Sequence, residues 1–122
     1  MVLDGHLTCE SLDRAIASVA PEMDGQRVLL LIDCRDMTGY DDEARVALMR
    51  WHRDPKTTMA RTAVLSRRRM WHIIVAAMST FSRVPMQAFE EPAIARAWLT
   101  AEDPRPPCSG TNWPAWPEAP PV

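Results

Sequence analysis

Five consecutive aliphatic residues, VLLLI at positions 28–32, constrain the fold more than any other feature of the chain. The run has no alternating polar positions, so it does not have the pattern of a strand with one face in water. It is typical of a strand buried on both faces, as in parallel sheets covered by helices. A chain of 122 residues is long enough for one domain of this kind.

The segments around this run alternate between strand and helix periodicity. Strands are expected at residues 1–5, 27–33, 61–66 and 84–89. Helices are expected to begin near Thr8 or Ser11, Asp41, Ser66 and Glu91. The βαβαβαβα order predicts an α/β domain with a small, mostly parallel four-stranded sheet and about four helices, joined by right-handed crossovers.

Apolar stripes indicate which helical residues face the core, and Pro85 predicts that the last strand lies at an edge of the sheet. The residues expected to face inward are Met70, Ile74, Ala77, Met78 and Phe81 in the third helix, and Ile94, Ala97 and Trp98 in the last.

Charge and composition limit the classes of partner. The formal net charge of −2 argues against nucleic acid and anionic lipid. The N-terminal segment MVLDGHLTCE lacks the basic region of a signal peptide, and the longest apolar run, MWHIIVAAM, is far shorter than the ~20 residues of a membrane span. Three scattered cysteines suit a reducing compartment. We therefore expect a soluble, cytoplasmic protein.

The composition changes after Asp103. Residues 104–122 hold seven of the eleven prolines, and proline disfavours both helix and central strand. We expect an ordered domain at residues 1–103 and a disordered, Pro/Trp-rich tail at 104–122. Trp113 and Trp116 either fold back loosely on the domain or form a short docking motif with polyproline character.

Polar residues gather where the predicted strands end. Ligands of parallel α/β sheets tend to bind at this edge, and residues 33–42 are expected to form a polar loop there. The candidate residues for binding a partner or ligand are Asp33, Arg35, Asp36, Thr38, Asp41, Asp42, Ser66, Arg67, Arg68, Arg69 and Trp71.

Arg67, Arg68 and Arg69 stand at the predicted start of a helix, where their charge opposes the helix dipole. Together with the free N–H groups of a helix start, they could form an anion site. Alternatively, they extend into solvent or pair with the carboxylates of the neighbouring loop. Trp71 lies beside the inward stripe of its helix and is a candidate for a surface or pocket, which keeps a small apolar ligand in view.

The sequence contains no arrangement that predicts catalysis. Cys34 could act as a nucleophile only if a base, His52 or His72, lay within hydrogen-bond reach of its thiol. No spacing in the sequence predicts such an arrangement. His6 and Cys9 are at most half a metal site, because no second pair has ligand spacing. Four unclustered glycines exclude the usual nucleotide fingerprints. We expect no enzyme activity, cofactor or metal.

Four segments follow one another in an order that is shared with a known family: GHLT, VLLLIDCRDMTGYDDEA, RTAVLSRRRMWHII and MQAFEEPAIARAWL. They resemble the SpoIIAA-like or STAS domains of sulphate transporters and anti-sigma factor antagonists. The resemblance covers about residues 2–101. It implies a STAS-like fold and a non-enzymatic, regulatory domain that binds a protein partner. A module for a small anionic or lipid-like ligand is the alternative.

The chain departs from this pattern in its first strand. STAS domains usually begin with an additional strand, whereas Met1 lies almost inside what would be the second. Either an edge strand is lost or the chain begins late. An exposed edge can pair with another chain, so homodimerisation stays open.

The second departure concerns phosphorylation. In the anti-sigma factor antagonists a serine at the start of the second helix is phosphorylated, and here that stretch reads Asp41, Asp42, Glu43, Ala44. The nearest hydroxyl is that of Thr38, upstream in the loop. The family's serine switch therefore cannot be carried over to this chain.

Overall fold

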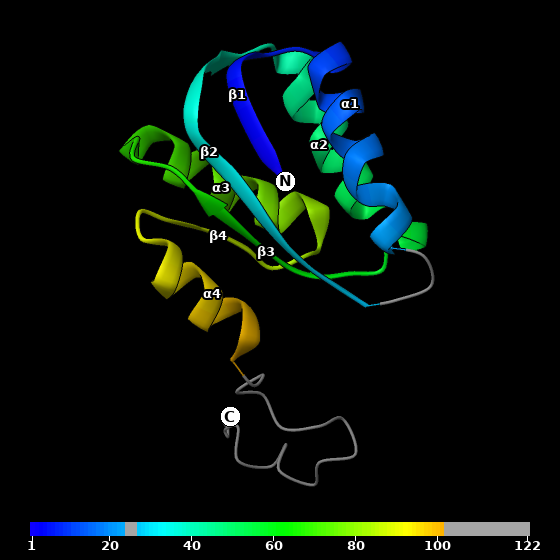
Figure 1. Ribbon diagram of the computed structural model, residues 1–122, viewed down its shortest axis with the longest axis vertical. Coiled ribbons are helices and arrows are strands. Elements are labelled where there is room, and N and C mark those ends of the chain that lie inside the picture. Colours follow the sequence, from blue (N-terminus) through cyan, green and yellow to red (C-terminus); the bar gives the residue numbers. More distant parts are fainter. Residues whose placement is uncertain (24–26, 102–122) are drawn as a thin grey trace, which may run out of the picture.

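The computed structural model describes residues 1–23 and 27–101 (Figure 1). The predicted alternation of strands and helices is confirmed within these residues. The elements are β1 Val2–Leu7, α1 Cys9–Val19, β2 Val28–Tyr40, α2 Asp42–Arg53, β3 Met59–Leu65, α3 Arg69–Ser82, β4 Met86–Phe89 and α4 Pro92–Thr100, with short 3₁₀ turns at Ala20–Met23 and Pro55–Thr57.

The four strands form one parallel sheet in the order β1-β2-β3-β4. As Pro85 predicts, β4 is an edge strand. The larger core lies on the face covered by α1, α2 and α3, and Leu12 and Ile32 are fully buried in it. A smaller core lies on the other face, where α4 packs Ala95 and Leu99 against β3 (Figure 1). The tail predicted at residues 104–122 lies outside the described residues.

The prediction of a polar loop at residues 33–42 is wrong, because β2 continues to Tyr40. Residues 33–40 pair with β1, from Val2 opposite Asp33 to Leu7 opposite Tyr40. The extension has polar side chains because it projects beyond β3, whose pairing with β2 ends at Leu65. The first strand also runs past its predicted end at Gly5, which takes a φ of +63° next to a shift in register.

Several predicted helix faces are also wrong. Ser66 does not cap α3 but is buried before it, and the helix begins at Arg69. Met70 and Phe81, expected inside, are exposed, because the buried face of α3 is formed by Val75, Met78 and Ser82. Four further residues are exposed although the sequence predicted them to be buried. They are Ala77 on α3, Ile94 and Ala97 on α4, and Leu29 on β2.

The start of α1 confirms one of the two predicted caps. The Thr8 side chain accepts a hydrogen bond from the Ser11 N–H, and the Ser11 hydroxyl accepts one from the Thr8 N–H. This reciprocal capping box satisfies two backbone donors. No helix in the described part of the chain is long and apolar enough to cross a membrane.

Arg83 ends α3 in the left-handed region, with a φ of +63°. A side chain at such a position is strained, whereas glycine adopts it freely. We expect Arg83→Gly to raise the free energy of unfolding by about 0.5–1 kcal/mol, because relief of the left-handed strain, about 1–2 kcal/mol, exceeds the added entropy of glycine in the unfolded chain, about 0.4–1 kcal/mol. Urea denaturation measures the change, and Arg53→Gly, in the last turn of α2, is the control that should destabilise. A loss of stability in Arg83→Gly would contradict the prediction.

Candidate functional site

Two candidate residues on β2, Asp33 and Arg35, lie on the face of the sheet away from the larger core. Ile32 and Cys34 point into the larger core, so the alternation of a strand places Asp33 and Arg35 on the face of α4. There Arg35 Nε and Nη2 donate to the two carboxylate oxygens of Asp33 at 3.0 and 2.8 Å. These hydrogen bonds hold the pKa of the Asp33 carboxyl below its ordinary value. The two charges pair with each other on the side of the sheet opposite α3.

A second group does come together, where α3 begins beside the end of β2. Arg68 Nη1 donates to the Thr38 carbonyl at 3.3 Å. The Arg68 guanidinium lies over the Trp71 ring, 4.7 Å from its centroid, and that ring meets Tyr40 edge-on at 6.1 Å. Arginine over tryptophan is a favourable cation–π contact. The group joins the start of α3 to the end of the longest strand.

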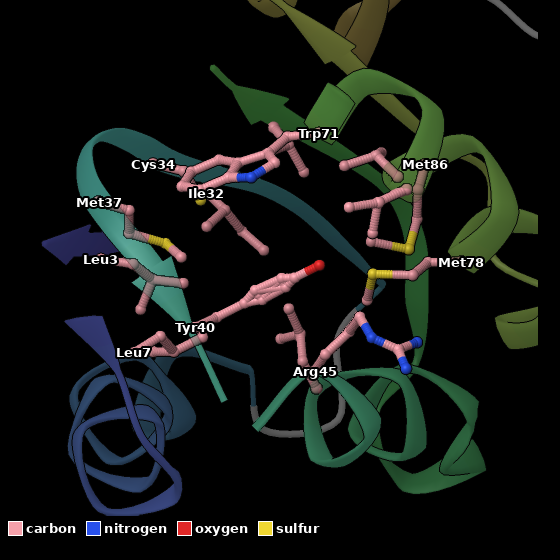
Figure 2. A pocket seen from close by; sticks show the side chains of 14 residues that line it. Leu3, Leu7, Ile32, Cys34, Met37, Tyr40, Arg45, Trp71, Met78 and Met86 are labelled. Carbon is pink, nitrogen blue, oxygen red and sulfur yellow. The ribbon is translucent and has the colours of Figure 1, made fainter. Parts of the chain in front are cut away.

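A small apolar cavity of about 70 Å³ lies directly beneath this group. Figure 2 shows Tyr40 and Trp71 pointing into it from different elements. Tyr40, Arg45 and Trp71 supply the polar groups of the lining, and the remaining residues are aliphatic or contain sulfur. The cavity is lined by Leu3, Leu7, Ile32, Cys34, Met37, Tyr40, Arg45, Leu48, Val64, Trp71, Ile74, Val75, Met78 and Met86.

An open groove of about 320 Å³ between α2 and α3 adjoins the cavity. The two hollows share Tyr40, Arg45, Ile74 and Met78. Phe81 stands at the far part of the groove and is 63% exposed. The cavity and the groove therefore adjoin each other across these shared side chains, and we refer to the two together as the channel.

Cys34 is not placed for nucleophilic chemistry. Burial, with a contribution from the neighbouring Asp33 charge, raises the pKa of its thiol to about 12, and a thiolate is the reactive form. His52 is hydrogen-bonded to the Leu48 carbonyl and the Thr62 hydroxyl, and His72 to the Ser66 carbonyl. Neither histidine is thus paired with the thiol, and Cys34 instead lines the apolar cavity.

The start of α2 consists of charged side chains followed by Ala44. Asp41 precedes the helix and contacts His6, with His6 Nε2 and Asp41 Oδ1 2.7 Å apart. Asp42 lies 4.0 Å from Arg45 Nε. Since Ala44 is fully buried, the first turn offers exposed carboxylates and no side-chain hydroxyl.

The arginines after β3 remain largely in solvent. Arg67, Arg68 and Arg69 are exposed, and none forms an ion pair with the carboxylates of Asp36 or Asp41. Of these three arginines, Arg68 contacts the end of β2, where it donates a hydrogen bond to the Thr38 carbonyl. The basic turn therefore keeps its charge available to a ligand or partner.

Sequence reasoning missed the residues that make the channel. Tyr40 and Arg45 were not candidates, because the first stood in a supposed loop and the second in the polar part of a helix. Ile73, 68% exposed on α3, was also missed. It could have been found from the composition of α3, which has more apolar residues than one buried helix face can accommodate. No group of three or more metal-ligating side chains gathers among residues 1–23 and 27–101.

Comparisons with known proteins identify the family and the fold. The family model described as SpoIIAA-like matches residues 1–100. A crystal structure of an uncharacterized protein of the DUF3478 family from Shewanella loihica PV-4, which has a SpoIIAA-like fold, superposes with a TM-score of 0.67. The two chains are 18% identical, and the match covers 80% of each. No curated protein matches the chain.

Proposed function

The chain belongs to the SpoIIAA-like family, and on this premise we propose that it is a non-enzymatic regulatory domain that binds a partner protein through α3. The binding surface consists of the basic turn Arg67–Arg69 and an apolar stripe formed by Met70, Ile73 and Phe81. Recognition does not depend on a phosphorylated serine at the start of α2, because that helix begins with carboxylates.

The exposed apolar stripe is the observation that carries this proposal. Met70 and Ile73 are 67% and 68% exposed, and with Phe81 they follow one side of the helix. Large apolar side chains that line up in solvent indicate an interaction site more strongly than scattered ones. The apolar groove to α2 runs beside them, as in surfaces that accept an amphipathic segment.

The charges around the stripe favour a protein partner over an anionic membrane. Arg67–Arg69 stand at one end of the surface, whereas the exposed Asp42, 4.0 Å from Arg45, lines the groove on the other side. An anionic lipid surface would attract the first and repel the second. A protein segment that carries apolar anchors, with acidic residues near the arginines and a basic residue near Asp42, complements both.

The test compares variants in which exposed apolar residues become serine. Met70→Ser/Ile73→Ser removes the centre of the stripe, and Ile94→Ser on α4, where the side chain is 58% exposed, is the matched control. Tagged proteins are used to isolate partners from a lysate of the host, and a partner retained by the wild type is then titrated. We expect the double variant to bind at least tenfold more weakly and the control to bind like the wild type.

Two results would contradict this assignment. One is equal binding of every retained partner by both variants, which would place recognition elsewhere. The other is cosedimentation of the wild type, but not of the double variant, with anionic vesicles. That outcome would assign the stripe to a membrane surface instead.

The channel supports a second candidate, the binding of a small apolar ligand with an anionic end. The cavity volume of about 70 Å³ is roughly half that of an engineered apolar cavity of about 150 Å³ that binds benzene. It can take only the end of a chain, and the rest would follow the groove past Arg45, whose guanidinium can meet a carboxylate. Calorimetric titration with octanoate tests this, and an absence of binding heat at millimolar concentration would count against it.

A further inference from the structure

We propose that the Arg68 guanidinium and the Trp71 ring form a latch over the apolar cavity, and that an acidic group that binds Arg68 releases this latch. The inference rests on the proposed function in one respect, since the acidic group would belong to a partner that binds the basic turn Arg67–Arg69. The contacts of Arg68 and the place of Trp71 in the cavity wall carry the argument.

The Trp71 ring separates the cavity from solvent at the start of α3. The ring is half-buried and lines the cavity, whereas Arg68 is exposed and is not part of the lining. The Arg68 guanidinium lies over the ring, 4.7 Å from its centroid. The indole therefore lies between the guanidinium and the hollow, and a displacement of the ring would open the cavity on this side.

The contacts that hold the latch are weak ones. Within residues 1–23 and 27–101, the Arg68 guanidinium makes one hydrogen bond, from Nη1 to the Thr38 carbonyl at 3.3 Å. This distance is longer than is usual for such a bond. The cation–π contact with Trp71 is formed by an exposed arginine, and water weakens such a contact. The edge of the ring meets Tyr40 at 6.1 Å.

A carboxylate would compete effectively for this guanidinium. Arginine binds a carboxylate through two charge-assisted hydrogen bonds, each about twice as strong as a bond between neutral groups. None of the carboxylates in the described part of the chain forms an ion pair with Arg68. An acidic side chain of a partner would therefore draw Arg68 away from the Thr38 carbonyl and the Trp71 ring, and partner binding would increase access to the cavity.

Cys34 reports on this opening in the absence of any partner or ligand. Its side chain is 8% exposed and lines the same cavity as Trp71 (Figure 2). In the reference protein, Cys9→Ser/Cys108→Ser, it is the only cysteine. Iodoacetamide then reacts at a rate that depends on access to this thiol. Burial raises the pKa of Cys34 to about 12, so the reaction of the reference protein should be slow at pH 8.5.

The latch is removed by Arg68→Ala in the reference protein, and Arg69→Ala is the matched control. Arg69 stands in the same turn and carries the same charge, but it forms no hydrogen bond, ion pair or ring contact through its side chain within the described residues. We expect Arg68→Ala to be modified at least fivefold faster than the reference protein, and Arg69→Ala at an unchanged rate. Equal rates in all three proteins, or equal acceleration by both substitutions, would overturn the proposal.

Hexaglutamate tests whether an acidic group releases the latch. At millimolar concentration and constant ionic strength, it should accelerate modification of the reference protein at least threefold. It should have no effect on Arg68→Ala, in which the latch is already absent. An unchanged rate in the reference protein would overturn the release by an acidic group.

Urea denaturation of the same proteins separates local opening from unfolding. Arg68→Ala should unfold near the midpoint of the reference protein, because Arg68 is exposed. A faster reaction that an equal increase in the unfolded fraction explains would overturn the proposal. These measurements require neither octanoate nor a partner protein, so a failure of the latch is distinguishable from a failure of the partner surface, which has its own variants.

Discussion

Acidification below about pH 6.5 is expected to destabilise the fold through His52. This side chain is only 2% exposed, and both ring nitrogens have partners at 2.9 Å. The Leu48 carbonyl can only accept, so Nδ1 carries the proton and Nε2 accepts from the Thr62 hydroxyl. The neutral ring is thus fully satisfied, and a second proton would bring a charge into the core.

The direction of the effect follows from the pKa. Burial lowers the pKa of His52 below its ordinary value of 6.5, so the unfolded chain binds a proton at a pH where the folded chain does not. The contribution to stability is complete above pH 6.5 and is lost as the pH falls towards the folded pKa. For one proton, the free energy of unfolding falls by up to about 1.4 kcal/mol per pH unit.

The comparison uses urea denaturation of the wild type and of His52→Met at several values between pH 7.5 and 5. Methionine fills the buried space of the histidine but cannot accept the hydrogen bond of the Thr62 hydroxyl. We therefore expect the variant to be less stable by about 1–3 kcal/mol at pH 7.5. The difference between the two proteins should narrow as the pH falls, because only the wild type loses the contribution of His52. Parallel curves would contradict the assignment, since His6 and His72 are present in both.

The sequence predicts the fold correctly wherever the local residue pattern matches the environment of those residues in the folded protein. VLLLI forms the core of β2, Thr8 begins α1, and Pro85 precedes an edge strand. The end of β2 could not be predicted, because its polar side chains resemble a loop until β1 pairs with them. Pairing between strands that are distant in sequence leaves no local signal at either one.

The sequence placed the candidate residues at the strand ends, and the structure brings only some of them together. Strand ends in a parallel sheet do meet at one edge, which is why Thr38 and Arg68 are in contact. The alternation of side chains then sends Asp33 and Arg35 to the opposite face, a division that appears only once the polar segment is known to be a strand. In α3, the choice of the buried face depends on how the helix rotates against the sheet, and its apolar composition allows more than one rotation.

The volume of the cavity can be changed at one position without altering the groove. Cys34 points into the cavity from β2 (Figure 2). Cys34→Leu adds methyl groups to the cavity, whereas Cys34→Ala enlarges it. We expect the leucine variant to bind octanoate at least tenfold more weakly than the wild type, a loss of about 1.4 kcal/mol, and the alanine variant to bind it equally well or better.

Stability should move in the opposite sense, which separates an effect on the ligand site from damage to the fold. Cys34→Ala removes buried contacts and should lower the free energy of unfolding by about 1–2 kcal/mol, while Cys34→Leu should leave it unchanged or raise it. Calorimetric titration and urea denaturation of the three proteins measure both quantities. If octanoate binds all three proteins with equal affinity, it lies outside the cavity. The hollow beside α3 would then be a groove for a protein partner and not a site for a small ligand.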